Sequence, residues 1–177
     1  MKLKILILVA LIMIVIFLGF MYKQHNEEYI FEDIECTIKG LAVCFLNGNP
    51  ALLNQYFSED AIFVYQGKEI DFDTANLSAT QSFNSIKMNV VDFQIGPENE
   101  LKYKHIGGNV AVTFNGFFEV KDTNFAPKLN ASVIFKRDNN SDWKITRIES
   151  NDIIFKYYFF IDQDVINQMN EKVKAKK

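Results

Sequence analysis

Alternation of apolar and polar residues in the second half of the chain is the strongest constraint on its fold. It recurs in five stretches, and turn signals such as Gly107-Gly108 separate them. The stretches are 89–95, 100–106, 109–121, 128–137 and 143–150. A period of two places every second side chain on the same face of a sheet. We therefore expect consecutive, mainly antiparallel strands.

Helical spacing precedes these strands. Apolar residues recur every three or four positions from Tyr29 to Leu46, which predicts a first helix. A short second helix is expected at 50–57, a strand at 61–67, and a weaker third helix at 71–88. Helices followed by an antiparallel meander predict an α+β layer fold, in which the sheet curls around the helices and leaves a conical cavity.

The N-terminus predicts a membrane anchor. Every residue from Ile5 to Met21 is apolar or glycine, with Tyr22 at the edge, which is the short end of transmembrane length. No pair of small residues follows to permit signal cleavage, so we expect an uncleaved signal-anchor, with a cleaved signal peptide and secretion as the alternative. Lys2 and Lys4 favour an N-terminus in the cytoplasm and an extracytoplasmic remainder.

Charge separates the anchor from the rest of the chain. Of the 19 basic and 22 acidic residues, residues 1–26 contain three lysines and no acid, which leaves 16 basic and 22 acidic residues and a net charge of −6. An acidic domain argues against nucleic acid as a partner, because phosphate binding needs a basic surface. We expect an anchor at 1–26, one domain at 27–160 and a basic helical tail at 161–177.

Three stretches resemble a known superfamily. They are "FLNGNPALLNQYFSEDAIFVYQG" (45–67), the Gly107-Gly108-Asn109 hairpin and "DNNSDWKITRIES" (138–150), and together they are similar to the NTF2-like (SnoaL-like, cystatin-related cone) superfamily over about 30–150. The resemblance implies a cone of three N-terminal helices packed on a curved, mainly antiparallel sheet, here preceded by one transmembrane helix. Such folds host many functions, so the resemblance says more about fold than about function.

One catalytic relative, ketosteroid isomerase, provides a test of activity. Its chemistry uses a tyrosine, an aspartate base and a second aspartate, and the resemblance places these at Leu41, at Tyr65 and near Ser132 or Val133. None of the three groups is retained, and a phenol with a pKa near 10 is a poor base at neutral pH. We therefore expect no such activity and assign no catalytic residue.

A polar set could still line the cone. Simple alternation along 143–150 places Trp143, Arg147 and Glu149 on one face, and Tyr65 takes the inward position at the end of its strand. These four residues are the candidate ligand pocket. Alternatively, Arg147 and Glu149 form an ion pair at the edge of the sheet or face solvent, as exposed strand pairs commonly do.

The aromatic stretch 153–161 has two interpretations. It is either a final strand or flap that covers the core, or an interface for a homodimer or an envelope protein, because exposed apolar patches mark association. The interface candidates are Phe155, Tyr157, Tyr158, Phe159 and Phe160. His25 and His105 have no acidic or cysteine cluster at ligand spacing, and no phosphate loop occurs, so we expect neither a metal nor a cofactor.

Two functions from different classes follow. The first is a membrane-anchored, extracytoplasmic NTF2-like module for protein binding or envelope-complex assembly, without catalysis. The second is a SnoaL-like protein that binds a small molecule in its cone, as a binder or as an isomerase, cyclase or hydrolase. Convergence of Tyr65, Arg147 and Glu149 in an open cavity would favour the second.

Overall fold

The structure is a computed structural model that describes residues 2–46, 48–85, 90–95, 101–121 and 126–160, together with Asn167 and Glu171. The chain divides into two compact units, Met1–Cys36 and Thr37–Lys177, and each is described by itself. In the sequence, the boundary between the units lies ten residues after the one expected at 26. Apart from Asn167 and Glu171, the predicted helical tail at 161–177 lies outside the described residues.

One helix covers both the predicted anchor and the predicted first helix. α1 spans Lys2–Leu46, and its ion pair between Lys23 and Glu27 measures 3.8 Å. Among the residues whose side chains are described, no helix is long and apolar enough to cross a membrane. The predicted span at 5–22 includes 5–11, whose side chains lie outside that description.

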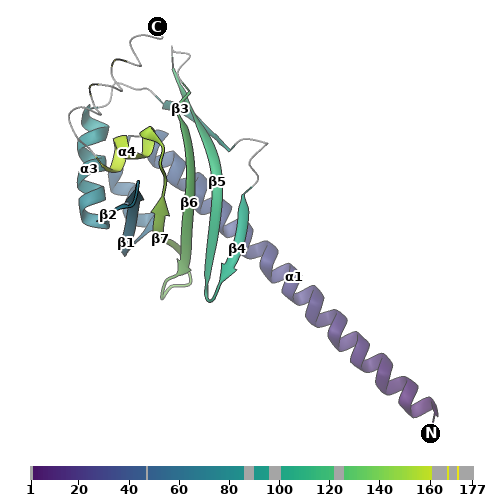
Figure 1. The fold of residues 1–177 in the computed structure, drawn as a ribbon. Coiled ribbons are helices and arrows are strands. Elements are labelled where there is room, and N and C mark those ends of the chain that lie inside the picture. The colour runs from purple at the N-terminus through teal and green to yellow at the C-terminus, as the bar shows by residue number, and fades with distance from the viewer. Residues whose placement is uncertain are drawn as a thin grey trace. The chain divides into compact units, whose positions relative to one another are not determined.

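The second unit is built on a curved, seven-stranded sheet (Figure 1). The strand order is β2-β1-β7-β6-β5-β3, and β4 also pairs with β5. Neighbouring strands are antiparallel except β1 and β7, which are parallel. The strands are β1 (Phe57–Tyr65), β2 (Lys68–Asp71), β3 (Val90–Ile95), β4 (Lys102–Ile106), β5 (Asn109–Val120), β6 (Lys128–Arg137) and β7 (Trp143–Glu149). The α+β class and the mainly antiparallel sheet are therefore confirmed, but β3 pairs with β5 instead of β4, so only β4 to β7 form the expected meander.

The helices differ from the prediction in number and place. The second helix is a 3-10 turn at Pro50–Leu52 followed by α2 (Leu53–Tyr56), and α3 spans Phe72–Ser85. A further helix, α4 (Ile153–Phe159), follows the sheet where a strand or flap was expected. Where α1 passes α2, a Cβ on Gly40 would lie 2.6 Å from the Tyr56 hydroxyl, so a larger residue there would require the Tyr56 ring to shift.

One face of the sheet forms the core. Strand pairing places Phe63 beside Ile148, Ile148 beside Val133, and Val133 beside Val112. All four side chains are at most 1% exposed. α3 and α4 pack against the β1 side of this sheet (Figure 1).

Aromatic rings fill the space between the sheet and its helices. We call Phe57, Phe63, Phe72, Phe155 and Phe159 the aromatic cluster. The Phe63 ring centroid lies 4.8 Å from those of Phe57 and Phe159, and 6.4 Å from those of Phe72 and Phe155. At these separations rings are in contact, so the cone that the fold predicts is packed with side chains at this point.

Polar contacts hold α4 in place. The Ser82 hydroxyl on α3 donates to the Tyr157 carbonyl at 2.6 Å. At the start of α4, the Asp152 carboxylate accepts from the backbone and from the side-chain amide of Asn130, the latter at 2.7 Å. The Ser150 amide donates to the Val64 carbonyl at 3.1 Å. α4 is therefore bound to β1, β6 and α3.

The predicted interface residues lie mostly in this core. Phe155, Tyr157, Tyr158 and Phe159 are at most 3% exposed, and only Phe160 is half-buried. The interface prediction assumed that these rings are exposed on the domain surface, and for four of them the structure shows burial. The alternative, that the stretch covers the core, is correct in role, although the element is a helix.

Replacing Tyr157 by Phe is expected to stabilise the domain, above all at alkaline pH. The buried Tyr157 hydroxyl has no hydrogen-bond partner among the described residues, and burial raises its pKa to about 12. An unfolded tyrosine ionises near 10, so stability is complete below about pH 10 and falls as pH rises towards 12. Tyr157→Phe removes this loss of stability at high pH. It also removes a buried hydroxyl without a hydrogen-bond partner among the described residues, which costs the folded state about 1 kcal/mol.

Urea unfolding followed by Trp143 fluorescence measures this effect, because the chain contains a single tryptophan. We expect Tyr157→Phe to raise the midpoint at pH 7 and to raise it further at pH 11. Tyr22→Phe, at an exposed position, is the matched control and should change neither value. An equal gain at both pH values would contradict the assignment.

Candidate functional site

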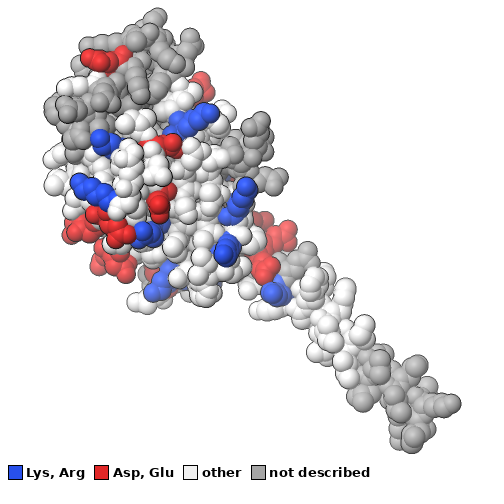
Figure 2. Space-filling model, viewed as in Figure 1, with Lys and Arg blue, Asp and Glu red and all other residues white. Residues whose placement is uncertain are grey.

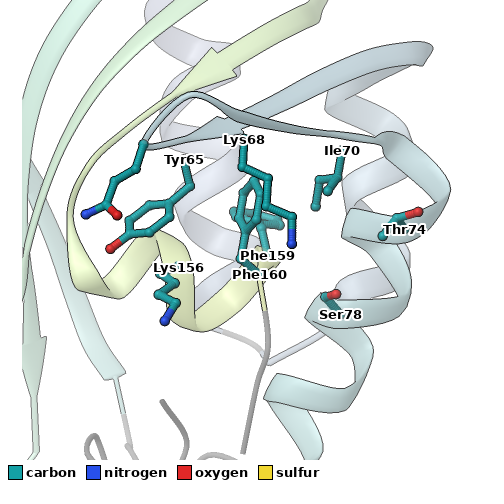
Figure 3. Close-up of a pocket in the computed structure, with 9 residues that line it drawn as sticks. Tyr65, Lys68, Ile70, Thr74, Ser78, Lys156, Phe159 and Phe160 are labelled. Carbon is teal, nitrogen blue, oxygen red and sulfur yellow. The ribbon is translucent and has the colours of Figure 1, made fainter. Parts of the chain in front are cut away.

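A surface groove lies where the β1–β2 hairpin meets α3 and α4 (Figure 3). Its volume is about 410 Å³. The nine lining residues are Tyr65, Gln66, Lys68, Ile70, Thr74, Ser78, Lys156, Phe159 and Phe160. We call this site the groove.

A tight turn forms the first wall. Gln66 and Gly67 both have positive φ, 50° and 78°, as a two-residue turn between antiparallel strands requires. A positive φ is unusual for a residue other than glycine. At Gln66 the backbone amide donates to the side-chain oxygen of Asn151 at 3.0 Å, and this hydrogen bond holds that conformation. The turn places Lys68 opposite Tyr65 in the register of the hairpin.

The first turns of α3 form the second wall. The Asp71 carboxylate accepts from the Thr74 amide at 2.8 Å, as an N-cap residue does. Hydrogen bonds from the Thr74 side chain and backbone lower the pKa of Asp71. Thr74 and Ser78 are four residues apart, so both hydroxyls lie on the face of α3 that borders the groove.

The third wall is aromatic and carries a cation. The Tyr65 ring lies 5.7 Å from that of Phe160, and Phe159 continues the surface from the aromatic cluster. Lys156 precedes Phe160 by one helical turn and also lines the groove. No aspartate or glutamate is among the nine described lining residues. The groove thus combines cations, hydroxyls and rings, without the carboxylate that proton transfer commonly uses.

The structure separates the sequence-predicted pocket residues. Tyr65 lines the groove, but Trp143, Arg147 and Glu149 do not. β7 contains a bulge: Ile145 pairs with Phe135, whereas Arg147, two residues later, pairs with the residue of β6 just before Phe135. The extra residue reverses the alternation, so Ile145 and Ile148 are buried while Glu149 is exposed.

Arg147 forms an ion pair with a different acid from the one expected. Its Nη2 lies 2.8 Å from Oε1 of Glu69 on β2, and both side chains are partly exposed, at 36% and 54%. An exposed pair of this kind contributes little to stability. The predicted ion pair between Arg147 and Glu149 is therefore wrong: Arg147 binds Glu69, and Glu149 is exposed.

Trp143 is part of the structural core. It is 8% exposed, and the guanidinium of Arg137 lies 5.0 Å from the centre of its ring. A cation over an indole face is a favourable contact. Trp143 therefore packs beneath Arg137 and contributes no surface to the groove.

The two cysteines and the possible metal ligands among the described residues are further candidates for chemistry. Cys36 is exposed and Cys44 is buried, and both are free. Burial raises the pKa of the Cys44 thiol to about 11, so it is almost entirely protonated at neutral pH. Among the described residues, no three His, Cys, Asp or Glu side chains lie close enough together to hold a metal ion.

Sequence reasoning missed most of the groove. The "QGK" turn (66–68) was a recognisable hairpin signal that fixes Lys68 beside Tyr65. Lys156 is the one basic residue within the aromatic stretch 153–161, which marks it as a position that reaches the surface. Nothing in the local sequence indicated that these two lysines border one groove.

Comparison with known proteins supports the fold. No protein-family model matches the chain, and no curated protein matches it. Among solved structures, an NTF2-like protein from Shewanella oneidensis matches with a TM-score of 0.56 and 16% identity, covering 69% of this chain and 98% of that one. An NTF2-like protein from Cytophaga hutchinsonii matches with a TM-score of 0.52 and 14% identity over 67% of this chain and 94% of that one.

A candidate ketosteroid isomerase from Shewanella frigidimarina matches with a TM-score of 0.51 and 12% identity, over 65% of this chain and 91% of that one. Identities this low establish shared architecture and leave activity open. The curved sheet, the helices on one of its faces and these three matches together show that the chain contains a domain with the NTF2-like fold.

Proposed function

We propose that this chain is a membrane-anchored NTF2-like module that binds another molecule and catalyses no reaction, with its domain on the outer side of a cytoplasmic membrane. The observation that carries the proposal is the aromatic cluster. Phe63, Phe155 and Phe159 occupy the space between the sheet and α4, where a cone enzyme needs room for substrate and polar groups.

Residues at the positions expected for an isomerase also favour binding over catalysis. Leu41 and Val133 are buried aliphatic residues at 6% and 1% exposure. Tyr65 takes the third position, at the rim of the groove. The candidate isomerase among the structural matches therefore shares its fold with this chain, and none of these three side chains is the carboxylate that ketosteroid isomerisation uses as a base.

The exposed apolar surface of α1 supports the anchor. From Ile12 to Tyr22, ten large apolar side chains are each between 49% and 76% exposed. A helix that is apolar on every side is stable in lipid or buried in protein, and unfavourable in water. In Figure 2 this segment is white, and coloured charged residues follow it further along α1. With Ile5 to Leu11, also apolar, the run is long enough to span a bilayer.

Fractionation tests the anchor. We expect the full chain to stay in the membrane pellet after washing with alkaline carbonate, which strips peripheral proteins. A chain of residues 27–177 should appear in the soluble fraction. Release of the full chain by carbonate would contradict the anchor, as would sedimentation of the shortened chain with membranes.

The two native cysteines report the orientation. Cys36 follows the proposed span and is exposed, whereas Cys44 is buried and protonated at neutral pH. With the domain outside, a membrane-impermeant maleimide should label Cys36 in intact cells, and Cys36→Ser should abolish nearly all labelling. Labelling that appears only after lysis would place the domain in the cytoplasm.

The partner of the module is either a second copy of the chain or another envelope protein. Crosslinking and mass spectrometry in native membranes distinguish these partners, because a homodimer gives crosslinks between identical residues. A monomer without reproducible neighbours would contradict both protein partners, and would say nothing against a small ligand bound to the same module.

A further inference from the structure

We propose that the groove binds a small organic anion: a carboxylate, sulfonate or phosphate carried on an aromatic or branched aliphatic body. The inference rests on the proposed function, since it assigns the groove to binding without turnover. It names the chemical class of the ligand and the residues that recognise each half of it.

The charge of the groove selects an anion. Lys68 comes from the β1–β2 hairpin and Lys156 from α4, and both line the groove. The two acids nearest Lys68 in sequence are engaged elsewhere. Glu69 binds Arg147 at 2.8 Å, and Asp71 accepts from the Thr74 amide at 2.8 Å. Neither lines the groove, so no carboxylate among the described lining residues competes with an anionic ligand.

Hydroxyl groups border the same region. Figure 3 shows the Lys68 side chain extending from the hairpin towards α3, where the hydroxyls of Thr74 and Ser78 border the groove. An oxyanion can accept hydrogen bonds from an ammonium and a hydroxyl together, and bonds to a charged group are stronger than neutral ones. The ammonium comes from β2 and the hydroxyls come from α3. The hydrogen bond from the Thr74 amide to Asp71 fixes the junction between these two elements.

Size and apolar surface limit the rest of the ligand. The groove volume of about 410 Å³ falls within the range of about 300–1,000 Å³ for small-molecule sites. Tyr65 and Phe160 present rings 5.7 Å apart, and Ile70 adds an aliphatic surface. A flat or branched apolar body fits this wall, whereas an inorganic ion would leave it uncovered.

A pair of probes that differ only in charge tests the proposal. Naphthalene-2-sulfonate is an anion, and naphthalene-2-sulfonamide is its neutral counterpart of the same shape at pH 7. Binding of each to the full chain in a non-ionic detergent is measured by isothermal titration calorimetry. We expect the sulfonate to bind more tightly, and its advantage to shrink as salt is raised.

Variants assign the two halves of the ligand. Lys68→Met and Lys156→Met should each weaken sulfonate binding about two- to fivefold and leave sulfonamide binding unchanged. Phe160→Ala should weaken both probes. Lys104→Met, on the exposed edge strand β4, is the matched control and should change neither. Equal affinity for the two probes, no binding of either, or equal effects of Lys68→Met and Lys104→Met would overturn the proposal.

Failure here is distinguishable from failure of the proposed function. A chain that resists carbonate extraction and has Cys36 outside, but does not prefer the sulfonate, remains an anchored module whose ligand is not an organic anion. A chain that prefers the sulfonate but is released by carbonate retains the anion site and loses the anchor.

Discussion

Phe63→Ala is expected to lower the free energy of unfolding of the domain by about 3–5 kcal/mol, the usual range for removing a buried phenylalanine. Phe63 is fully buried, and its ring contacts those of Phe57 and Phe159 at 4.8 Å. Truncation removes these contacts and leaves a cavity among the rings that β1, α3 and α4 contribute. Because domains are commonly stable by only about 5–15 kcal/mol, such a loss is a large fraction of the total.

Urea unfolding of the full chain in a non-ionic detergent, followed by Trp143 fluorescence, measures this loss. Phe63→Leu keeps most of the volume and should cost only about 1–2 kcal/mol. Tyr65→Ala, two residues along the same strand and half-exposed, is the matched control and should cost less than about 1 kcal/mol. A loss for Phe63→Ala no larger than that for Tyr65→Ala would mean that the cone is open at this point.

Strands with a clear alternating pattern could be predicted from the sequence to within one or two residues. Residues 128–137 were expected as a strand, and β6 is Lys128–Arg137. β5 ends one residue earlier than expected. These strands are long and have one buried face, so apolar and polar residues alternate along them and the alternation predicts the strand.

Short or charged elements could not be predicted in the same way. β2 is only Lys68–Asp71, and a four-residue strand with three charged residues has no alternating pattern to detect. β1 begins at Phe57, four residues before the expected start at 61, because its pairing with β7 extends into a stretch with helical composition. β2 therefore depends on its pairing with β1 across the turn, and the start of β1 depends on β7, which is distant in sequence.

The prediction that Arg147 and Glu149 line a pocket with Tyr65 was wrong for a geometric reason. Alternation predicts that Arg147 shares a face with Ile145, and the single-residue bulge in β7 places the two on opposite faces. A bulge depends on the pairing of two strands, which one strand's sequence does not reveal. The groove depends in addition on α4, whose run of apolar residues has no clear period and fits a strand or a helix equally well.

Phe155→Asp is expected to prevent the domain from folding. Phe155 is 1% exposed and its ring lies 5.1 Å from that of Phe159. The substitution removes a buried ring, at about 3–5 kcal/mol, and places an ionisable carboxyl in apolar surroundings, which adds a further penalty of several kcal/mol. The sum matches the whole stability of a typical domain. Trp143 fluorescence without urea should already resemble that of the unfolded chain.

Lys156→Asp makes the matched comparison, because it introduces the same side chain one position further along α4. Lys156 is half-exposed and borders the groove, so this variant should remain folded with a loss of about 1 kcal/mol or less. The pair also separates the two interpretations of the aromatic stretch. If Phe155 belonged to an interface between chains, Phe155→Asp would give a folded monomer. Since the ring lies within the domain, the variant should lose its cooperative urea transition, whatever its state of association.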